Sequence, residues 1–229
     1  RRLTRKKPAC FETQADGVVT LLKFPDCKQK IDEGGLRLRG FYKADNVDKP
    51  LITVVTVVYN GAEFLEDTIK SVIEQSYDNL EYIIVDGGSK DGTLNVIKKY
   101  EHAIDYWVSE PDKGIYDAMN KGWVLISPLS RILFLGSGDK VLTLPTLCEI
   151  KKNNNSVIYG NVDIENRVFL SRVGWITKLG NSLHHQALLV PKKLHVKSPF
   201  DTAFTIYADY DFNLRLYLSG VSFFKSKQF

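Results

Sequence analysis

The sequence predicts an α/β protein with a mostly parallel central sheet flanked by helices. Residues 51–58 (LITVVTVV) and 80–85 (LEYIIV) are apolar runs with almost no alternation, a pattern typical of parallel strands covered on both faces. Each run leads into a loop and then into a stretch with apolar residues at helical spacing. The alternation of strand and helix predicts right-handed crossovers between neighbouring parallel strands.

The remaining elements follow in chain order. The first helix comes after residues 59–61, has acidic residues near its positive end and carries an apolar face of Leu65, Ile69, Val72 and Ile73. Residues 93–100 predict a second helix with Leu94 and Ile97 inward, and a further helix begins near residue 115. Residues 131–135 (RILFL) predict a strand, and residues 153–172 predict two short strands around a turn. The last predicted helix has a face of Tyr210, Leu214, Tyr217 and Leu218, and a final strand falls within residues 221–229.

Residues 1–50 lack sustained periodicity and predict an irregular N-terminal extension, followed by one domain over residues 51–229. The extension holds 12 Lys and Arg against 7 Asp and Glu, whereas the remainder holds 19 against 20. Five basic residues lie in the first seven (RRLTRKK), which suits either a solvated end or an arm near phosphate or an anionic membrane surface. We expect no nucleic-acid partner, because the folded part shows no basic patch interleaved with aromatic residues.

Cysteine usage and hydropathy indicate a cytoplasmic protein, with peripheral contact at the inner face of the cell membrane as an option. Cys10, Cys27 and Cys148 form no CxxC pair, and the odd count argues against a disulfide framework. No apolar stretch approaches the roughly 20 residues of a membrane-spanning helix. The sequence has no initiator Met and no signal-peptide pattern, so we expect a trimmed chain or a piece of a longer protein.

The stretch that follows the second strand, DGGSKDGT, predicts a ligand site. Loops that leave the carboxyl ends of adjacent parallel strands form the ligand crevice, where Asp86 can accept hydrogen bonds from a base edge or ribose. Gly87 and Gly88 permit close backbone approach, and Ser89 or Asp91 can cap the next helix. The alternative is that Asp86 only starts a tight turn. Neither G-x-G-x-x-G nor G-x-x-x-x-G-K-[ST] occurs in these loops, which argues against a dinucleotide dehydrogenase and a P-loop enzyme.

Residues 52–100, followed by EPDKGIYDAMNKG at 110–122, resemble the nucleotide-binding half of glycosyltransferase family 2, the inverting enzymes with the Rossmann-like GT-A fold. The resemblance extends from residue 51 to about 218. It implies a nucleotide-diphosphate sugar donor, usually a UDP-sugar, and a divalent metal, Mn²⁺ or Mg²⁺. It also implies transfer to a hydroxyl of a glycan or lipid-linked glycan acceptor, as in the synthesis of bacterial surface polysaccharides such as lipopolysaccharide O-antigen.

The resemblance assigns the donor-binding residues. Those that match positions around the nucleoside are Thr56, Tyr59, Asn60 and Asp86. Relatives often have an Arg that holds the diphosphate where this chain has Met119, and Asp112 and Lys113 are candidate substitutes. A solvated turn before the helix is the alternative for this pair.

The metal motif of the family is reduced here. Relatives usually show two or three acids after the strand at 131–135, whereas this chain has GSGDK with Asp139 alone. One carboxylate suffices in principle, because Mg²⁺ is held by one or two carboxylates together with substrate phosphates and water. Asp139 as a plain turn residue is the alternative.

Two further positions match the family's active site. His185, in HHQ, corresponds to a His that relatives place near the donor phosphates or the metal, although a structural histidine is the ordinary outcome. Asp209 matches the catalytic base before the last helix, with Asp211 as the alternative and helix capping as a further role for either. Relatives frequently have Glu-Asp where this chain has Ala208-Asp209.

Two competing functions remain open at this point. The lone Asp139 and Met119 also suit a nucleotide-sugar-binding module that has lost turnover. A structural assembly partner recruited through the basic arm would bind no nucleotide.

Overall fold

The structure is a computed structural model that describes residues 3–6, 20–165, 167–194 and 199–229. Its strands are β1 (Asp32–Gly34), β2 (Ile52–Val58), β3 (Leu80–Asp86), β4 (Tyr106–Ser109), β5 (Arg131–Gly136), β6 (Val157–Tyr159), β7 (Val162–Ile164), β8 (Arg167–Phe169), β9 (Leu188–Pro191) and β10 (Phe223–Lys225). Its α-helices are α1 (Ala62–Ile73), α2 (Thr93–Lys99), α3 (Ile115–Val124), α4 (Leu147–Lys152) and α5 (Ala208–Leu218). Short 3-10 helices are η2 (Leu36–Arg39), η3 (Glu101–Ala103), η4 (Trp175–Lys178), η5 (His185–Ala187) and η6 (Lys192–Leu194).

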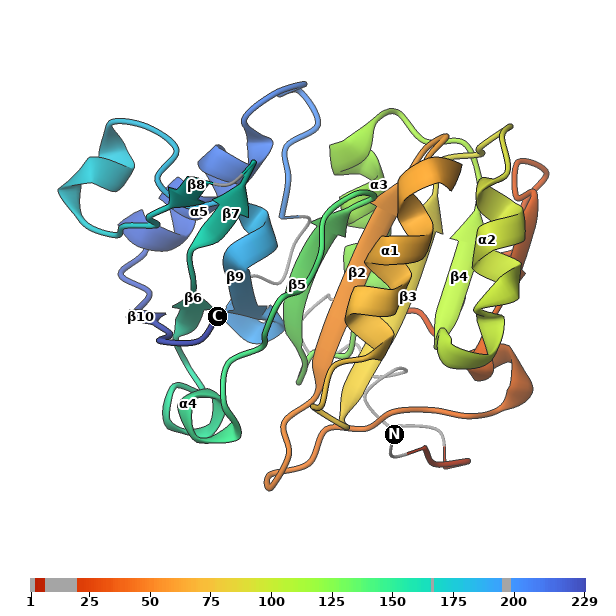
Figure 1. Cartoon of the computed structure of the whole chain (residues 1–229), viewed down its shortest axis with the longest axis horizontal. Helices are drawn as coiled ribbons and strands as arrows, with labels where there is room; N and C mark the ends of the chain where they lie inside the picture. Colours follow the sequence, from red (N-terminus) through yellow and green to blue (C-terminus); the bar gives the residue numbers. More distant parts are fainter. Residues whose placement is uncertain (1–2, 7–19, 166, 195–198) are drawn as a thin grey trace.

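The main sheet has the strand order β1-β4-β3-β2-β5-β9-β6-β10 (Figure 1). Strands β4, β3, β2 and β5 are parallel neighbours. β1 and β9 pair antiparallel on either side of this parallel block, and β7 and β8 form a separate hairpin. The predicted α/β class with a mostly parallel sheet is confirmed.

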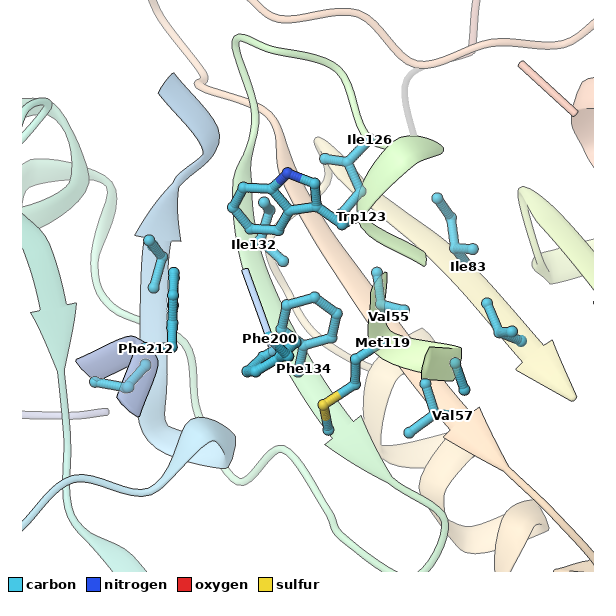
Figure 2. Packing of buried hydrophobic residues seen from close by; sticks show 14 of the residues in the cluster. Val55, Val57, Ile83, Met119, Trp123, Ile126, Ile132, Phe134, Phe200 and Phe212 are labelled. Carbon is cyan, nitrogen blue, oxygen red and sulfur yellow. The ribbon is translucent and has the colours of Figure 1, made fainter. Parts of the chain in front are cut away.

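The central strands are covered on both faces, which explains their unbroken apolar runs. Along β2, Val55 and Val57 pack in one cluster with Met119 and Trp123 of α3 (Figure 2). On the opposite face of the sheet, Ile52 and its buried neighbours pack in a second cluster with side chains of α1 and α2. Each fully buried aliphatic side chain contributes about 1.5–3 kcal/mol of transfer free energy, so the two clusters fix the strands between the helices.

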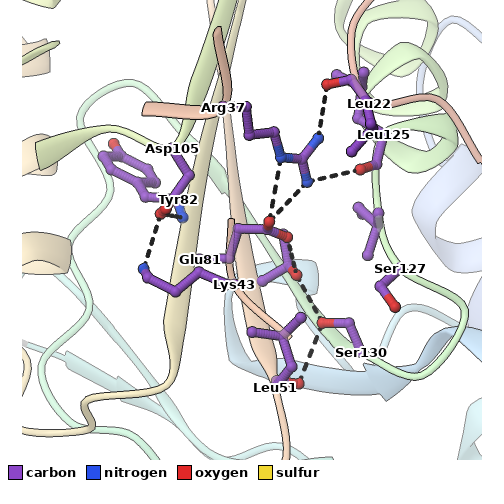
Figure 3. Close-up of polar contacts among 12 residues, drawn as sticks. Leu22, Arg37, Lys43, Leu51, Glu81, Tyr82, Asp105, Leu125, Ser127 and Ser130 are labelled. Carbon is purple, nitrogen blue, oxygen red and sulfur yellow. Dashed lines mark hydrogen bonds and ion pairs between the residues drawn. The ribbon is translucent and has the colours of Figure 1, made fainter. Parts of the chain in front are cut away.

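The described part of the N-terminal extension from residue 20 is built into the domain. β1 adds an edge strand to β4, and two basic side chains enter the interior (Figure 3). The guanidinium of Arg37 lies 2.7 Å from Glu81, and the ammonium of Lys43 lies 3.1 Å from Asp105. All four side chains are almost fully buried. A buried charge needs such a partner, so the extension completes the polar interior at β3 and β4.

The last third of the chain differs from expectation in two respects. Residues 153–172 contain three short strands rather than two, because β6 joins the main sheet while β7 and β8 pair with each other. The predicted face of α5 is wrong, because the helix buries Ala208, Asp209, Phe212, Asn213 and Leu216. Tyr210, Leu214, Tyr217 and Leu218 lie at partly or fully exposed positions. Burial of the polar residues on this face is favourable because they have hydrogen-bond partners inside the protein. The side-chain amide of Asn213, for example, donates to the carbonyl of Leu183 at 3.1 Å.

The basic arm and the cysteines lie partly outside the described residues. Within residues 3–6, Thr4 pairs with Tyr42 and the guanidinium of Arg5 lies over the ring of Phe41. Cys27 and Cys148 are exposed and unpaired, while Cys10 falls outside the described residues. Among the described helices, none combines the length and the apolar character needed to cross a bilayer. The membrane contact expected from the arm stays a prediction.

We expect Arg37→Ala to lower the free energy of unfolding by about 3–5 kcal/mol, because it leaves the buried carboxylate of Glu81 without its cation. Arg39→Ala is the matched control, since its ion pair with Glu101 is exposed and contributes less than about 1 kcal/mol. Urea unfolding of both variants measures the difference. Equal losses in the two variants would show that the extension does not stabilise the domain through Arg37.

Candidate active site

Four parallel strands end at one edge of the sheet and bring their outgoing loops together. Val58 of β2 is in register with Asp86 of β3, which is in register with Ser109 of β4. On the other side of β2, Val57 is in register with Gly136 of β5. Asp86 and the loop that carries Asp139 therefore lie at the same edge, as the parallel topology predicts. Figure 1 shows the parallel arrangement of these strands.

The buried carboxylate of Asp86 accepts hydrogen bonds from several residues at this edge. It is fully buried and accepts hydrogen bonds from the hydroxyl of Ser109 at 2.6 Å and from the backbone N–H groups of Gly88 and Ser89 at 3.1 and 3.0 Å. The hydroxyl of Ser89 donates to its other oxygen. Three of these donors converge on Oδ2 and one on Oδ1, so the buried carboxylate shapes the loop, and its expected contact with a base stays a prediction.

The loop after β2 is tied to the same network. The backbone N–H of Asn60 donates to the hydroxyl of Ser89 at 2.7 Å, and the Asn60 side chain accepts from the N–H of Lys90 at 2.9 Å. Asn60 has φ 48°, a left-handed conformation that Asn tolerates. Tyr59 beside it is 62% exposed, so its ring is free to stack on a base. Thr56 does not reach this edge, because it is buried and shares a hydrogen bond with the hydroxyl of Tyr82 at 3.1 Å.

Asp112 occupies the space that a side chain at position 87 would fill. A Cβ on Gly87 would lie 2.4 Å from Oδ2 of Asp112. Oδ1 of Asp112 accepts from the N–H of Gly114 at 2.8 Å, and among the described residues Oδ2 has no hydrogen-bond donor. Burial raises the pKa of Asp112, and the nearby charges of Asp117 and Asp86 add to this effect. A partly buried carboxylate oxygen without a donor, beside a glycine, is suited to receive N–H or O–H groups of a nucleoside.

The other two residues predicted near the diphosphate lie differently. Lys113 is exposed, and its ammonium forms no ion pair within the described ranges. Met119, where relatives often carry an Arg, is fully buried in the core beneath β2 (Figure 2). The Met119 position therefore faces the interior. Lys113 lies on the preceding loop as a cation without an ion pair among the described residues.

Asp209 lies at the N-terminus of α5 among three polar side chains. The hydroxyl of Tyr116 donates to Oδ1 at 3.2 Å and the side-chain amide of Asn181 donates to Oδ2 at 3.2 Å. Nδ1 of His185 lies 3.5 Å from Oδ2. These contacts bring α3, the loop before η5 and α5 to one point. Asp211, the alternative base, instead accepts from Nε of Arg215 at 2.8 Å along the helix.

Charge and hydrogen bonding keep Asp209 ionised. Burial by itself raises the pKa of Asp209, but the imidazole of His185, the N–H of Tyr210 and the amide of Asn181 outweigh burial. Together they hold the pKa below its usual 3.8, so the carboxylate is negative at neutral pH and able to accept a proton.

The two histidines connect this cluster with the strand edge. η5, which begins at His185, packs against β5. Apart from the 3.5 Å approach of Nδ1 to Asp209, neither ring nitrogen of His185 has a hydrogen-bond partner within the described residues, although both are buried. Burial lowers the pKa of His184, as does the charge of His185, while the charges of Asp209 and Asp139 oppose them. Both carboxylates thus lie within electrostatic reach of His184.

The residues at the strand edge fit a divalent metal only in company with donor phosphates. Oδ2 of Asp139 accepts from the N–H of Gly136 at 2.8 Å, and its other oxygen has no donor in the described part of the chain. The described residues contain no group of three His, Cys, Asp or Glu arranged to hold a metal. A single carboxylate oxygen matches a site in which phosphates and water supply the remaining ligands.

Sequence reasoning missed three residues of this site. Tyr116 lies inside the quoted GIYDAMNKG stretch, but nothing in its spacing signals a bond to Asp209. Asn181 lies in a segment without periodicity or motif. Ser109 ends a strand, and only the strand register reveals that it faces Asp86.

Substitution of Asp86 should mainly affect stability, whereas substitution of Asp112 should mainly affect UDP binding. We expect Asp86→Ala to lower the free energy of unfolding by about 3 kcal/mol, because buried donors lose their acceptor. Asp112→Ala should change stability by less than about 1 kcal/mol and weaken UDP binding about tenfold or more, since a charged acceptor is lost. Urea unfolding and calorimetric UDP titration measure the two effects. Unchanged UDP affinity in Asp112→Ala would contradict its role.

His185 should control the ionisation of Asp209. We expect His185→Gln to raise the pKa of Asp209, because burial then acts with less opposition. Carboxyl-detected NMR titration measures this pKa directly. His102→Gln, at an exposed position, is the control and should leave it unchanged. No change in His185→Gln would show that His185 does not act on the carboxylate.

Comparison with known proteins identifies similar sequences and folds. The model of the family described as "Glycosyl transferase family 2" matches residues 53–125. An uncharacterised glycosyltransferase of Mycobacterium tuberculosis is 40% identical over 92 residues, which are 40% of this chain and 35% of that protein. A PGL/p-HBAD biosynthesis glycosyltransferase of the same species is 28% identical over 184 residues, 73% of this chain and 70% of that protein.

Solved structures show the same fold. Residues 1–349 of TarS from Staphylococcus aureus superpose with a TM-score of 0.57 at 16% identity, over 73% of this chain and 55% of that one. The mannosyltransferase PcManGT from Pyrobaculum calidifontis gives a TM-score of 0.55 at 17% identity, over 80% and 56%. The match thus spans about a third of the first M. tuberculosis relative and about half of the TarS chain. The protein has the GT-A fold, and its residues 53–125 match the model of glycosyl transferase family 2.

Proposed function

We propose that the protein is a metal-dependent, inverting glycosyltransferase that moves a sugar from a nucleotide-diphosphate donor to a hydroxyl acceptor. The observation that carries this proposal is the ionised carboxylate of Asp209, held by Tyr116, Asn181 and His185 near the strand edge that carries Asp112 and Asp139. A base close to a nucleotide-binding edge is what sugar transfer to a hydroxyl requires.

The donor is proposed to be a UDP-sugar. Tyr59 stacks on the base, and Asp112 rather than Asp86 accepts a hydrogen bond from the base or ribose. Lys113 supplies a positive charge to the diphosphate. In support, TarS has been solved in complex with UDP and with UDP-GlcNAc, and PcManGT with GDP-Man and Mn²⁺.

The chemistry follows from the placement of the carboxylate. Asp209 takes the proton of the acceptor hydroxyl while the acceptor oxygen attacks the sugar carbon opposite the leaving diphosphate. Tyr116 and Asn181 orient the carboxylate, and His185 stabilises its charge. Asp139, with the donor phosphates, would hold a divalent metal, which neutralises charge on the leaving diphosphate when bound. Direct displacement by one base-activated hydroxyl inverts the configuration at the sugar carbon.

The acceptor is proposed to be a glycan or a lipid-linked glycan of the bacterial cell surface. Relatives named for teichuronic acid biosynthesis in Bacillus subtilis and for PGL/p-HBAD biosynthesis in M. tuberculosis support this class. A nucleotide-sugar-binding module without turnover is the second candidate, favoured by the single carboxylate at Asp139 and the buried Met119.

Turnover of UDP-sugars with Mn²⁺ or Mg²⁺ tests the proposal. We expect EDTA to abolish turnover, and Asp139→Ala to reduce it strongly. Asp209→Asn should lower kcat about 10²- to 10⁴-fold, because the base is lost, with UDP affinity retained. Asp211→Asn on the same helix is the matched control and should keep most of the activity.

Three results would overturn parts of this assignment. UDP binding without any metal-dependent turnover favours the binding module. Equal activity of Asp209→Asn and Asp211→Asn removes Asp209 as the base. No UDP binding, measured as the absence of thermal stabilisation, rejects the nucleotide site itself.

A further inference from the structure

A groove beside the Asp209 cluster is lined by none of the residues assigned to donor binding. It lies between β8 and the segment from η4 to residue 182 and has a volume of about 470 Å³. This size is within the range of sites for small organic ligands. The residues that define it here are Phe169, Leu170, Arg172, Ile176, Leu179 and Asn181.

Two residues that line the groove contact the Asp209 cluster or the histidines beside it. Asn181 lines the groove and donates to Oδ2 of Asp209 at 3.2 Å. Phe169 lines it as well, and its ring packs edge-on against His184 with centroids 4.4 Å apart. The groove therefore adjoins the candidate base through the side chain of Asn181.

The walls of the groove are mainly apolar. Leu179 is 72% exposed and Leu170 is 54% exposed, although contact between an apolar side chain and water is unfavourable. Arg172 is exposed and makes no ion pair within the described residues. Such walls offer few hydrogen-bond partners for a bare sugar, but they suit an alkyl or aryl group with a polar head near Arg172 and Asn181.

We propose that this groove is the acceptor subsite and that it binds the apolar aglycone of an amphiphilic glycoside. The aglycone lies against Phe169, Ile176 and Leu179, and the sugar hydroxyl points to Asp209. This inference rests on the proposed function, because it assigns the second substrate of the same reaction. It predicts that the enzyme prefers acceptors with an apolar group directly attached to the sugar.

The test compares octyl glycosides, kept below their critical micelle concentration, with the corresponding methyl glycosides. Calorimetry measures binding of each, and transfer from UDP-sugars measures their use as acceptors. We expect the octyl compounds to bind about tenfold or more tightly than the methyl compounds, because only they bury apolar surface in the groove. Transfer should show the same preference in KM.

Leu179→Asp and Leu142→Asp form a matched pair, since the two leucines are 72% and 71% exposed and only Leu179 lines the groove. Leu179→Asp should weaken octyl glycoside binding about tenfold and leave UDP affinity and acceptor-independent donor hydrolysis unchanged. Leu142→Asp should change none of these. Unfolding by urea verifies that both variants keep their stability.

The outcomes separate this inference from the proposed function. Equal binding of octyl and methyl glycosides, or equal effects of the two leucine variants, overturns the acceptor groove while UDP turnover stands. Octyl binding that depends on Leu179, without transfer to these glycosides by an enzyme that hydrolyses the donor, also overturns the acceptor assignment. Failure to bind UDP rejects the proposed function, and this inference with it, whatever the groove binds.

Discussion

The buried carboxylate of Asp86 is the interaction on which the site depends. Through Ser109 it fixes the end of β4, and through Ser89 it reaches the backbone of Asn60 after β2. Three adjacent strands thereby end in one rigid edge instead of three independent loops. Because an unpaired buried carboxylate is strongly unfavourable, the loops keep the conformation that supplies its donors. Asp112 gains its position over Gly87 from this arrangement.

The site combines residues from two parts of the chain, the loops after the parallel strands and helix α5. The loops after the parallel strands supply the edge with Tyr59, Asp112 and Asp139, and the α/β alternation of the sequence predicts the strands themselves. The candidate base comes from α5 and is held by a tyrosine of α3, 93 positions earlier in the chain. The mainly apolar groove adjoins this second part. In a fold divided in this way, the later segments can vary without a change in the strand edge.

Much of the first part was predictable from the sequence, and the second part was predictable only by resemblance. The runs in β2, β3 and β5 are apolar on both faces, so the pattern alone predicts buried strands of a parallel sheet, whereas the pairing of β5 with β2 is seen only in the structure. Pairings between distant residues leave no such pattern: Arg37 meets Glu81 across 44 positions. The buried face of α5 was predicted wrongly because Asp209 lies on it. Apolar periodicity does not detect a polar residue whose partners come from other elements.

The most direct test of the central claim is a crystal structure of the protein grown or soaked with UDP and Mn²⁺. The account predicts the uracil or ribose against Asp112 and Gly87, the diphosphate toward Lys113, and the metal bridging Asp139 and the phosphates. It also predicts that Asp86 keeps its four internal donors. Nucleotide bound away from this strand edge, or bound there through the carboxylate of Asp86 with the loop reopened, would contradict it.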